Sequence, residues 1–309
     1  MGTLGLFIFG LLLSLSMASK PECHRQGETL HCLLRTLSTN DSDFPIEAAS
    51  EAVSQVFLRC SDHQSESILR TNHFGYLPHL KKLSVTSCRV RRVPALAFSG
   101  LSSLTDLEFT QTGGKTDDAE VILEVESDAF TGLNSLQRLN FTSNNLWTLP
   151  EALFCSLNSL TELNLANNFL QDVKDLGFSS SELNSCRIPL RKLDLSSNSL
   201  SSLDVRAFGQ LRKLESLQLA SNNLNVIDDG ALGGLSTLIN LNLAHNRFVA
   251  LPNQLFAQTP YLQDLQLNNN SLSVLAPGLF DGLEHLVVLN MSRNALSDDW
   301  LTPQPYSCL

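Results

Sequence analysis

The sequence predicts an α/β solenoid, a curved stack of similar coils with a parallel sheet on the concave face and an irregular or short-helical convex side. Three observations predict this fold. Apolar residues recur in one fixed frame, the frame repeats at a regular spacing, and an asparagine follows most of the predicted strands. A chain of 309 residues would otherwise allow about two globular domains. The repeated frame instead makes every coil a unit that is stabilised by its neighbours.

The repeated frame is LxxLxLxxNxL, and it is clearest in LRKLDLSSNSL and LESLQLASNNL. The last four spacings between units are all 24 residues, within the range of about 20 to 29 residues of leucine-rich repeats. The sequence therefore predicts leucine-rich repeats over residues 53–296, in about ten units with the last one incomplete. The units begin at Val53, Leu80, Leu104, Leu136, Leu160, Leu190, Leu214, Leu238, Leu262 and Leu286.

In each unit the LxL alternation predicts a short strand with one face inward, followed by a turn at the asparagine. A buried turn needs hydrogen bonds, which asparagine side-chain amides can make with backbone groups of neighbouring coils. The predicted asparagine ladder consists of Asn144, Asn168, Asn198, Asn222, Asn246, Asn270 and Asn294. Ten residues after the asparagines of the regular units, a second apolar row is predicted for the convex half: Phe154, Phe178, Phe208, Leu232, Phe256 and Phe280.

Both ends of the chain depart from the repeat. Residues 1–18 contain an apolar run that ends in small residues, which is typical of a signal peptide. Residues 19–52 are predicted to cap the first coil and include two predicted disulfide cysteines, Cys23 and Cys32. Residues 297–309 form a divergent, uncapped tail. No apolar run is long enough to span a bilayer, so we expect a secreted chain without membrane insertion.

The cysteines are interpreted first as structural, because an exported protein can form disulfides. Cys60 and Cys88 follow the strands of two adjacent coils, where stacking brings them near each other; two small buried thiols are the alternative. Cys155 and Cys186 fall on the return side of consecutive coils, so a bond between them would tie down an inserted loop. Cys308 then has no obvious mate.

Three units are longer than 24 residues. The extra residues precede Phe74 in the first unit, lie in QTGGKTDDAEV in the third, and lie in SSSELNSC in the fifth. Loops of this kind project from one side of a solenoid and often bind partners, although a tolerated surface insertion is the alternative.

Four sequons predict N-glycosylation at Asn40, Asn140, Asn269 and Asn290. Asn140 and Asn290 stand on the predicted concave face, where glycans would obstruct a ligand. The face is polar and mixed in charge, without the cluster of Trp, Tyr and Arg that is typical of a strong binding hot spot. We therefore expect partners to bind the flank of the solenoid or the inserted loops.

The motifs argue against an enzyme. The seven histidines are scattered, and the sequence lacks HExxH, GxSxG, a glycine-rich phosphate loop and a CxxC pair. No catalytic, cofactor-binding or metal-binding residue is therefore predicted. The net charge of −10 repels nucleic acid and anionic lipid, so nucleic acid is not expected as a partner. A partner with basic patches fits this charge, although a negative surface also keeps a protein soluble.

Several stretches outside the frame carry a resemblance: VFLRCSD, HFGYLPHLKKLSVTSC, NNLWTLPEALFCSLNSL, FLQDVKDLGF, ALPNQLFA and NNSLSVLAPGLF. On these residues, from about Cys23 to about Leu301, the chain resembles the arthropod Toll receptors of the long-ectodomain, 18-wheeler/Tollo-like branch. The resemblance implies the N-terminal portion of a receptor ectodomain in innate immunity or development. Its implied ligands are Spätzle-type cystine-knot cytokines or partner receptors. Cys60, Cys88, Cys155 and Cys186 fall at matching positions of the family.

The chain departs from this family at its C-terminal end. Such receptors continue through more repeats, cysteine caps, a transmembrane helix and a cytoplasmic TIR domain, and TPQPYSCL resembles none of these. We therefore expect a chain that binds a protein ligand or a full-length Toll-type receptor without signalling itself. One alternative is a secreted matrix or adhesion protein. Another is a non-functional fragment whose last coil exposes Leu286, Leu289 and Met291 and favours aggregation.

Overall fold

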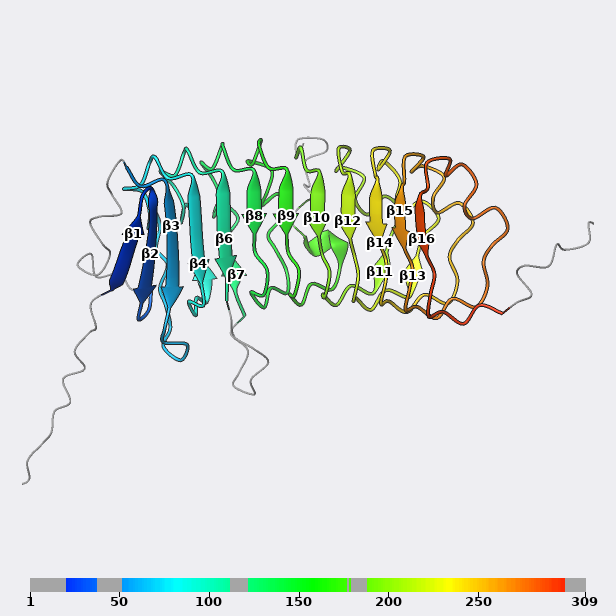
Figure 1. Cartoon of the computed structure of the whole chain (residues 1–309), viewed down its shortest axis with the longest axis horizontal. Coiled ribbons are helices and arrows are strands. Elements are labelled where there is room, and N and C mark those ends of the chain that lie inside the picture. Colours follow the sequence, from blue (N-terminus) through cyan, green and yellow to red (C-terminus); the bar gives the residue numbers. More distant parts are fainter. Residues whose placement is uncertain (1–20, 38–51, 112–121, 177, 179–187, 298–309) are drawn as a thin grey trace, which may run out of the picture.

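The computed structural model describes residues 21–37, 52–111, 122–176, 178 and 188–297. These residues form an elongated stack of coils around a 12-stranded sheet (Figure 1). The strands follow one another in the order β1-β2-β3-β4-β6-β8-β9-β10-β12-β14-β15-β16. They are β1 (Glu22–Gln26), β2 (Thr29–Leu34), β3 (Gln55–Cys60), β4 (Lys82–Thr86), β6 (Asp106–Thr110), β8 (Arg138–Asn140), β9 (Glu162–Asn164), β10 (Lys192–Asp194), β12 (Ser216–Gln218), β14 (Asn240–Asn242), β15 (Asp264–Gln266) and β16 (Val288–Asn290).

The predicted leucine-rich solenoid is confirmed by the strand pairing. From β2 onward, neighbouring strands of this sheet are parallel and come from successive coils. Their leucines are in register, since Leu193 pairs with Leu163 on one side and with Leu217 on the other. All three are at most 2% exposed. Burial of each such leucine contributes about 1.5 to 3 kcal/mol, which a coil obtains only when its neighbours cover it.

The convex side is almost free of helix in the described part of the chain. It contains the 3-10 helix η2 (Val173–Asp175) and two short parallel pairs, β5 (Arg92–Val93) with β7 (Glu124–Val125) and β11 (Ser202–Leu203) with β13 (Val226–Ile227). The return path otherwise consists of turns, because they reverse the chain in fewer residues than a helix needs. No helix within the described ranges is long and apolar enough to cross a membrane.

A column of phenylalanine rings fills the convex half of the first coils. Phe74, Phe98, Phe130 and Phe154 stack in that order, with ring centroids 6.0, 6.0 and 6.1 Å apart. Phe178 continues the column at 5.6 Å from Phe154. Phe98 was not included in the predicted row, because its coil lacks the asparagine from which the spacing was counted. The rings therefore form a second continuous part of the core, opposite the leucines of the sheet.

The ladder asparagines connect the bends of successive coils. Nδ2 of Asn222 donates to the carbonyl oxygens of Leu195 in the preceding coil, at 3.0 Å, and of Leu219 in its own coil, at 3.1 Å. Its Oδ1 accepts the N–H of Leu200 at 3.1 Å. The same donation to the preceding coil is made by Asn144, Asn168, Asn198, Asn246, Asn270 and Asn294. These amides satisfy backbone groups that the sheet leaves unpaired.

The N-terminal segment contains strands that the sequence analysis did not predict. Within residues 21–37, β1 and β2 form an antiparallel hairpin, and β2 pairs in parallel with β3 of the first coil. Leu30 and Cys32 of β2 point into the core, at 0% and 3% exposure. The hairpin covers the first coil and also extends the concave face by two strands.

At the opposite end, β16 lies at the edge of the sheet. Val287 is 81% exposed, Val288 43% and Leu289 37%. Leu286 and Met291, which were also expected to face outward, are partly buried and pack against the core. In the last described coil, Val287 and Val288 are therefore more exposed than the three residues that the repeat frame predicted to face outward, Leu286, Leu289 and Met291.

Candidate functional site

The concave face presents the outward-facing residues of each strand in rows. Successive residues of a strand alternate between core and surface, so the same positions of neighbouring strands lie side by side. One row contains His31 of β2, Phe57 of β3 and Ser84 of β4. The next row contains Leu33 of β2 beside Arg59 of β3. The hairpin strands thus bring side chains from outside the repeats onto the face that the coils build.

Five residues at this end of the face form what we term the concave cluster: His31, Leu33, Phe57, Arg59 and Lys82. The rings of His31 and Phe57 stack, with centroids 4.7 Å apart and 15° between their planes. Nζ of Lys82 lies 5.1 Å from the centroid of the Phe57 ring. Leu33 is 43% exposed, and neither Arg59 nor Lys82 forms an ion pair with any described residue. The cluster combines apolar surface with two unpaired cations.

This combination suits a ligand that carries an acidic group beside an apolar one. The guanidinium of Arg59 can bind a carboxylate with two parallel hydrogen bonds. Phe57 and Leu33 offer apolar contact area next to it, and aromatic and arginine side chains are enriched among residues that dominate binding energy. The cluster can therefore recognise an acidic protein surface without further rearrangement of the sheet.

The concave cluster was not predicted from the sequence. His31 and Leu33 fall within residues 19–52, which were predicted to cap the first coil. The available signal was the alternation of exposed and buried positions in TLHCLL and QVFLRC, which form β2 and β3. Only the pairing of these two strands places His31 against Phe57, and that pairing is a tertiary contact.

Farther along the face, charged side chains pair with each other. Asp106 of β6 pairs with Arg138 of β8, and Glu162 of β9 pairs with Lys192 of β10 at 3.0 Å. The hydrogen bond to Asp106 raises the pKa of Arg138 above its ordinary value. Because these charges neutralise each other, this part of the face offers a charged ligand fewer free ion-pair partners than the concave cluster does.

Three of the four predicted glycosylation sites lie within the described residues. Asn140 of β8 and Asn290 of β16 are half-buried on the concave face, and Asn269 lies at a bend with a φ of 55°. Asn40 lies outside the described residues. Between two and four strand steps separate the cluster strands from β8, or roughly 10 to 20 Å. A glycan on Asn290 of the edge strand β16 would therefore stand far from the N-terminal end of the face, whereas a glycan on Asn140 would stand near it.

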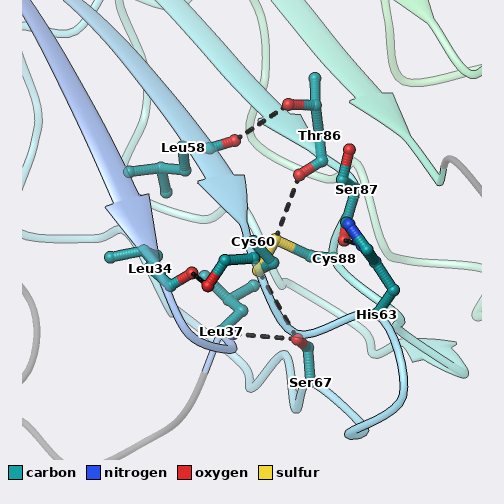
Figure 2. Close-up of a disulfide and its surroundings, with 10 residues drawn as sticks. Leu34, Leu37, Leu58, Cys60, His63, Ser67, Thr86, Ser87 and Cys88 are labelled. Atoms are coloured by element: carbon teal, nitrogen blue, oxygen red, sulfur yellow. Dashed lines mark hydrogen bonds between the residues drawn. A yellow bond between two sulfur atoms is a disulfide. The ribbon is translucent and has the colours of Figure 1, made fainter. Parts of the chain in front are cut away.

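Two disulfides hold the strands of the concave cluster. Cys23 and Cys32 join β1 to β2, with their sulfur atoms 2.13 Å apart. Cys60 at the end of β3 is bonded to Cys88, just after β4, with 2.05 Å between the sulfur atoms (Figure 2). Both bonds lie on the core side of the sheet, where all but Cys23 are buried. They restrict the relative positions of the strands that carry the cluster.

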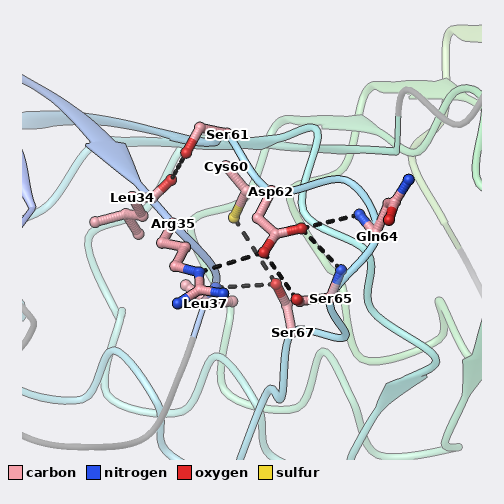
Figure 3. A network of polar contacts seen from close by, with 9 residues as sticks. All are labelled: Leu34, Arg35, Leu37, Cys60, Ser61, Asp62, Gln64, Ser65 and Ser67. Carbon is pink, nitrogen blue, oxygen red and sulfur yellow. Dashed lines mark hydrogen bonds and ion pairs between the residues drawn. The ribbon is translucent and has the colours of Figure 1, made fainter. Parts of the chain in front are cut away.

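Asp62 fixes the loop that follows β3 (Figure 3). Its carboxylate accepts the N–H groups of Ser65, at 3.0 Å, and Gln64, at 3.1 Å, and the hydroxyl of Ser65 at 2.8 Å. The guanidinium of Arg35, which follows β2, donates to it at 3.3 Å. These hydrogen bonds, led by those from Ser65, hold the pKa of the Asp62 carboxyl well below its ordinary value. The ionised group therefore connects the hairpin with the first coil beside the concave cluster.

The surfaces that were expected to bind partners are only partly described. The insertions in the third and fifth units fall mostly on residues 112–121 and 179–187, which lie outside the described residues. Cys186 and Cys308 also lie outside the described residues; Cys155 is disulfide-bonded, and its predicted pairing with Cys186 remains a prediction. On the flank, Trp147 and Phe169 form an aromatic pair with ring centroids 5.5 Å apart, and Tyr261 and His285, which precede β15 and β16, form another pair at 5.4 Å.

The side chains of the concave cluster are suited to noncovalent contacts, namely ring stacking, apolar packing and ion pairing. Its histidine stacks on a phenylalanine ring. Among the described residues, no group of three or more His, Cys, Asp or Glu could hold a metal ion.

Comparison with known proteins agrees with this architecture. Toll-like receptor 7 of Drosophila melanogaster is 32% identical over 193 residues, which cover 60% of this chain and 13% of that protein. The chain thus spans a small part of the length of this relative. The crystal structure of a TLR13–ssRNA13 complex contains a chain of the same fold, with a TM-score of 0.64 and 23% identity over 78% of this chain and 36% of that one.

The repeat itself identifies the family. The family model described as leucine rich repeat matches residues 118–170, 188–248 and 236–296, which together make up more than half of the chain. These matched residues contain the strands from β7 and β8 to β16 and all seven ladder asparagines. The chain belongs to the leucine-rich-repeat family.

Proposed function

We propose that this chain is an extracellular recognition module that binds a protein ligand at the concave cluster. The observation that carries the proposal is the stacked arrangement of His31, Phe57 and Lys82 beside the unpaired guanidinium of Arg59. The cluster lies at the end of the face that is distant from Asn290. Binding there replaces the flank and the inserted loops as our first choice of contact surface.

The ligand class that we propose is a Spätzle-type cystine-knot cytokine, or a partner Toll-type receptor, in innate immunity or development. Support comes from the resemblance to arthropod Toll receptors and from the 32% identity to Toll-like receptor 7 of Drosophila melanogaster. We further propose that the chain is secreted after removal of residues 1–18. Buried disulfides fit an oxidising compartment.

Single-stranded RNA is the second candidate ligand. A net charge of −10 argues against nucleic acid for the whole chain, but the charge of one site decides binding there. The concave cluster offers two cations and a partly exposed aromatic ring, which are the groups that bind phosphates and stack on bases. The similar fold in the TLR13–ssRNA13 complex makes this candidate worth testing.

The test is a charge reversal in the concave cluster. The double variant Arg59→Glu and Lys82→Glu is expected to weaken binding of a Spätzle-type cytokine by about 30- to 100-fold, because two attractions become repulsions. Surface plasmon resonance at fixed ionic strength measures this change. A labelled single-stranded RNA, titrated in parallel, distinguishes the second candidate from the first.

The matched control is Arg212→Glu with Lys213→Glu, two exposed cations on a coil remote from the cluster. This pair makes the same change in net charge, so it is expected to alter the affinity by less than about threefold. The proposal is wrong if the control pair weakens binding as much as the cluster pair. It is also wrong if the folded cluster variant binds the cytokine like the unmodified chain.

A further inference from the structure

A cavity lies on the convex side of the solenoid, on the face opposite the concave cluster and several coils farther along the chain. It occupies about 210 Å³ between the coil that contains η2 and the next coil, and Phe178 and Phe208 both line it. Phe154 and Phe178 are in ring contact at 5.6 Å. Among the described rings, none stacks on Phe178 from its other side or on Phe208. The cavity therefore lies where the phenylalanine column is interrupted.

The interruption lies between two coils whose return paths differ. The coil that begins at Leu160 contains 30 residues before Leu190, whereas the next coil contains 24 residues before Leu214. The longer coil uses η2 on its return path, while the shorter one uses the turn that contains Phe208. At this position no ring contact joins Phe178 to Phe208, and the space between the two coils remains open.

The walls of the cavity are apolar and its rim is charged. Val173 and Phe178 from one coil and Ala207 and Phe208 from the next form apolar walls. At the rim, Lys174 pairs with Asp204 at 2.7 Å. Asp172 also lies there, and its carboxylate accepts the N–H of Lys174 at 2.9 Å. These three charged side chains are already engaged with the protein.

Arg206 is the remaining charged side chain at the rim, and no described residue pairs with its guanidinium. Its backbone is fixed on both sides, since its N–H donates to Gly230 and its carbonyl accepts the N–H of Gly209, both at 2.9 Å. The side-chain stem lies close to Gly209 and Gly233, where an added Cβ would come within 3.0 Å of it. The two glycines therefore leave room for the start of the stem beside the following coil, and Arg206 also contributes to the lining of the cavity.

We propose that this cavity binds a small apolar carboxylate, with its apolar group against Phe178 and Phe208 and its carboxylate on Arg206. An apolar cavity of about 150 Å³ is large enough to hold benzene, so the larger volume here accommodates one ring with a short acidic arm. Because the charge of Lys174 is balanced by Asp204, Arg206 is the rim charge that favours an anionic ligand over a cationic one, and a neutral ligand would gain no ion pair. This site is separate from the proposed ligand surface on the concave face.

The probe for this proposal is phenylacetate, titrated into the full chain by isothermal calorimetry. We expect saturable binding with a dissociation constant on the order of 1 mM or tighter, as for a ligand of about ten non-hydrogen atoms. Phenylacetamide, the neutral analogue, is expected to bind at least about fivefold more weakly, and phenethylammonium not at all. Equal binding of the three compounds, or no saturation by phenylacetate at about 10 mM, overturns the proposal.

Variants separate the apolar part of the site from the charged part. Arg206→Gln is expected to weaken phenylacetate binding about tenfold, and Ala207→Leu, which fills the cavity, is expected to abolish it. Arg212→Gln removes an exposed cation that does not line the cavity, so binding should be unchanged. If Ala207→Leu fails to fold by circular dichroism, Arg206→Gln still decides. Unchanged affinity in folded Arg206→Gln contradicts the proposal.

Discussion

Replacing Phe130 by alanine is expected to lower the free energy of unfolding by about 3 to 5 kcal/mol. The Phe130 side chain is 1% exposed and contacts three other rings: Phe98 and Phe154 in the column, and Phe141 edge-on at 5.4 Å. Strand pairing and the asparagine ladder hold the neighbouring coils apart, so they cannot collapse into the space. Denaturant unfolding followed by circular dichroism measures the change.

Phe169→Ala is the matched control for this substitution. Phe169 is half-buried on the flank, where its ring contacts Trp147, so its loss is expected to cost less than about 1.5 kcal/mol. A similar unfolding midpoint for Phe130→Ala and Phe169→Ala would show that the phenylalanine column is not part of the stabilising core.

Asn222→Ala is expected to destabilise the chain by about 2 to 4 kcal/mol. The alanine removes the donor to the carbonyl oxygens of Leu195 and Leu219 and the acceptor of the N–H of Leu200. The Leu200 N–H then lacks its partner, at a cost of about 1 to 3 kcal/mol for an unsatisfied buried group. The carbonyl oxygens of Leu195 and Leu219 each lose one of two bonds and keep those from Asn198 and Asn246, at about 0.5 to 1.5 kcal/mol per lost bond. Denaturant unfolding gives the loss of stability. Hydrogen exchange of the Leu200 amide, expected to accelerate, locates it.

Asn225→Ala provides the comparison, because Asn225 is exposed three residues farther along the same coil. Its backbone N–H donates to Ser201, and the substitution leaves that bond in place. The expected change is within about 0.5 kcal/mol. If Asn222→Ala is as mild as Asn225→Ala, the ladder amides do not stabilise the bends.

The repeating part of the fold could be predicted because its determinants are local. In the units that begin at Leu190 and Leu214, the LxL alternation places β10 and β12 at the expected residues. The same frame places Asn198 and Asn222 at the bends, where their amides bond to the preceding coil. Each of these features depends on residues within one unit and on a neighbour of identical pattern.

The concave cluster could not be predicted from the frame. His31 lies in a hairpin that has no leucine-rich pattern, and its position against Phe57 depends on the pairing of β2 with β3. The net charge of −10 also gave no indication of the two cations in the cluster, because the net charge of a chain does not show where its charged residues lie. The cavity at Phe178 and Phe208 depends on how two neighbouring coils pack against each other, which the spacing of single residues does not determine.

Hydrogen–deuterium exchange of the full chain, with and without a Spätzle-type cystine-knot cytokine, tests most directly where this solenoid recognises its ligand. We expect slower exchange of amides in β2, β3 and β4 when the cytokine is bound, and unchanged exchange in β10 to β15. Slower exchange confined to the flank around Trp147, or to the C-terminal coils, would contradict this expectation.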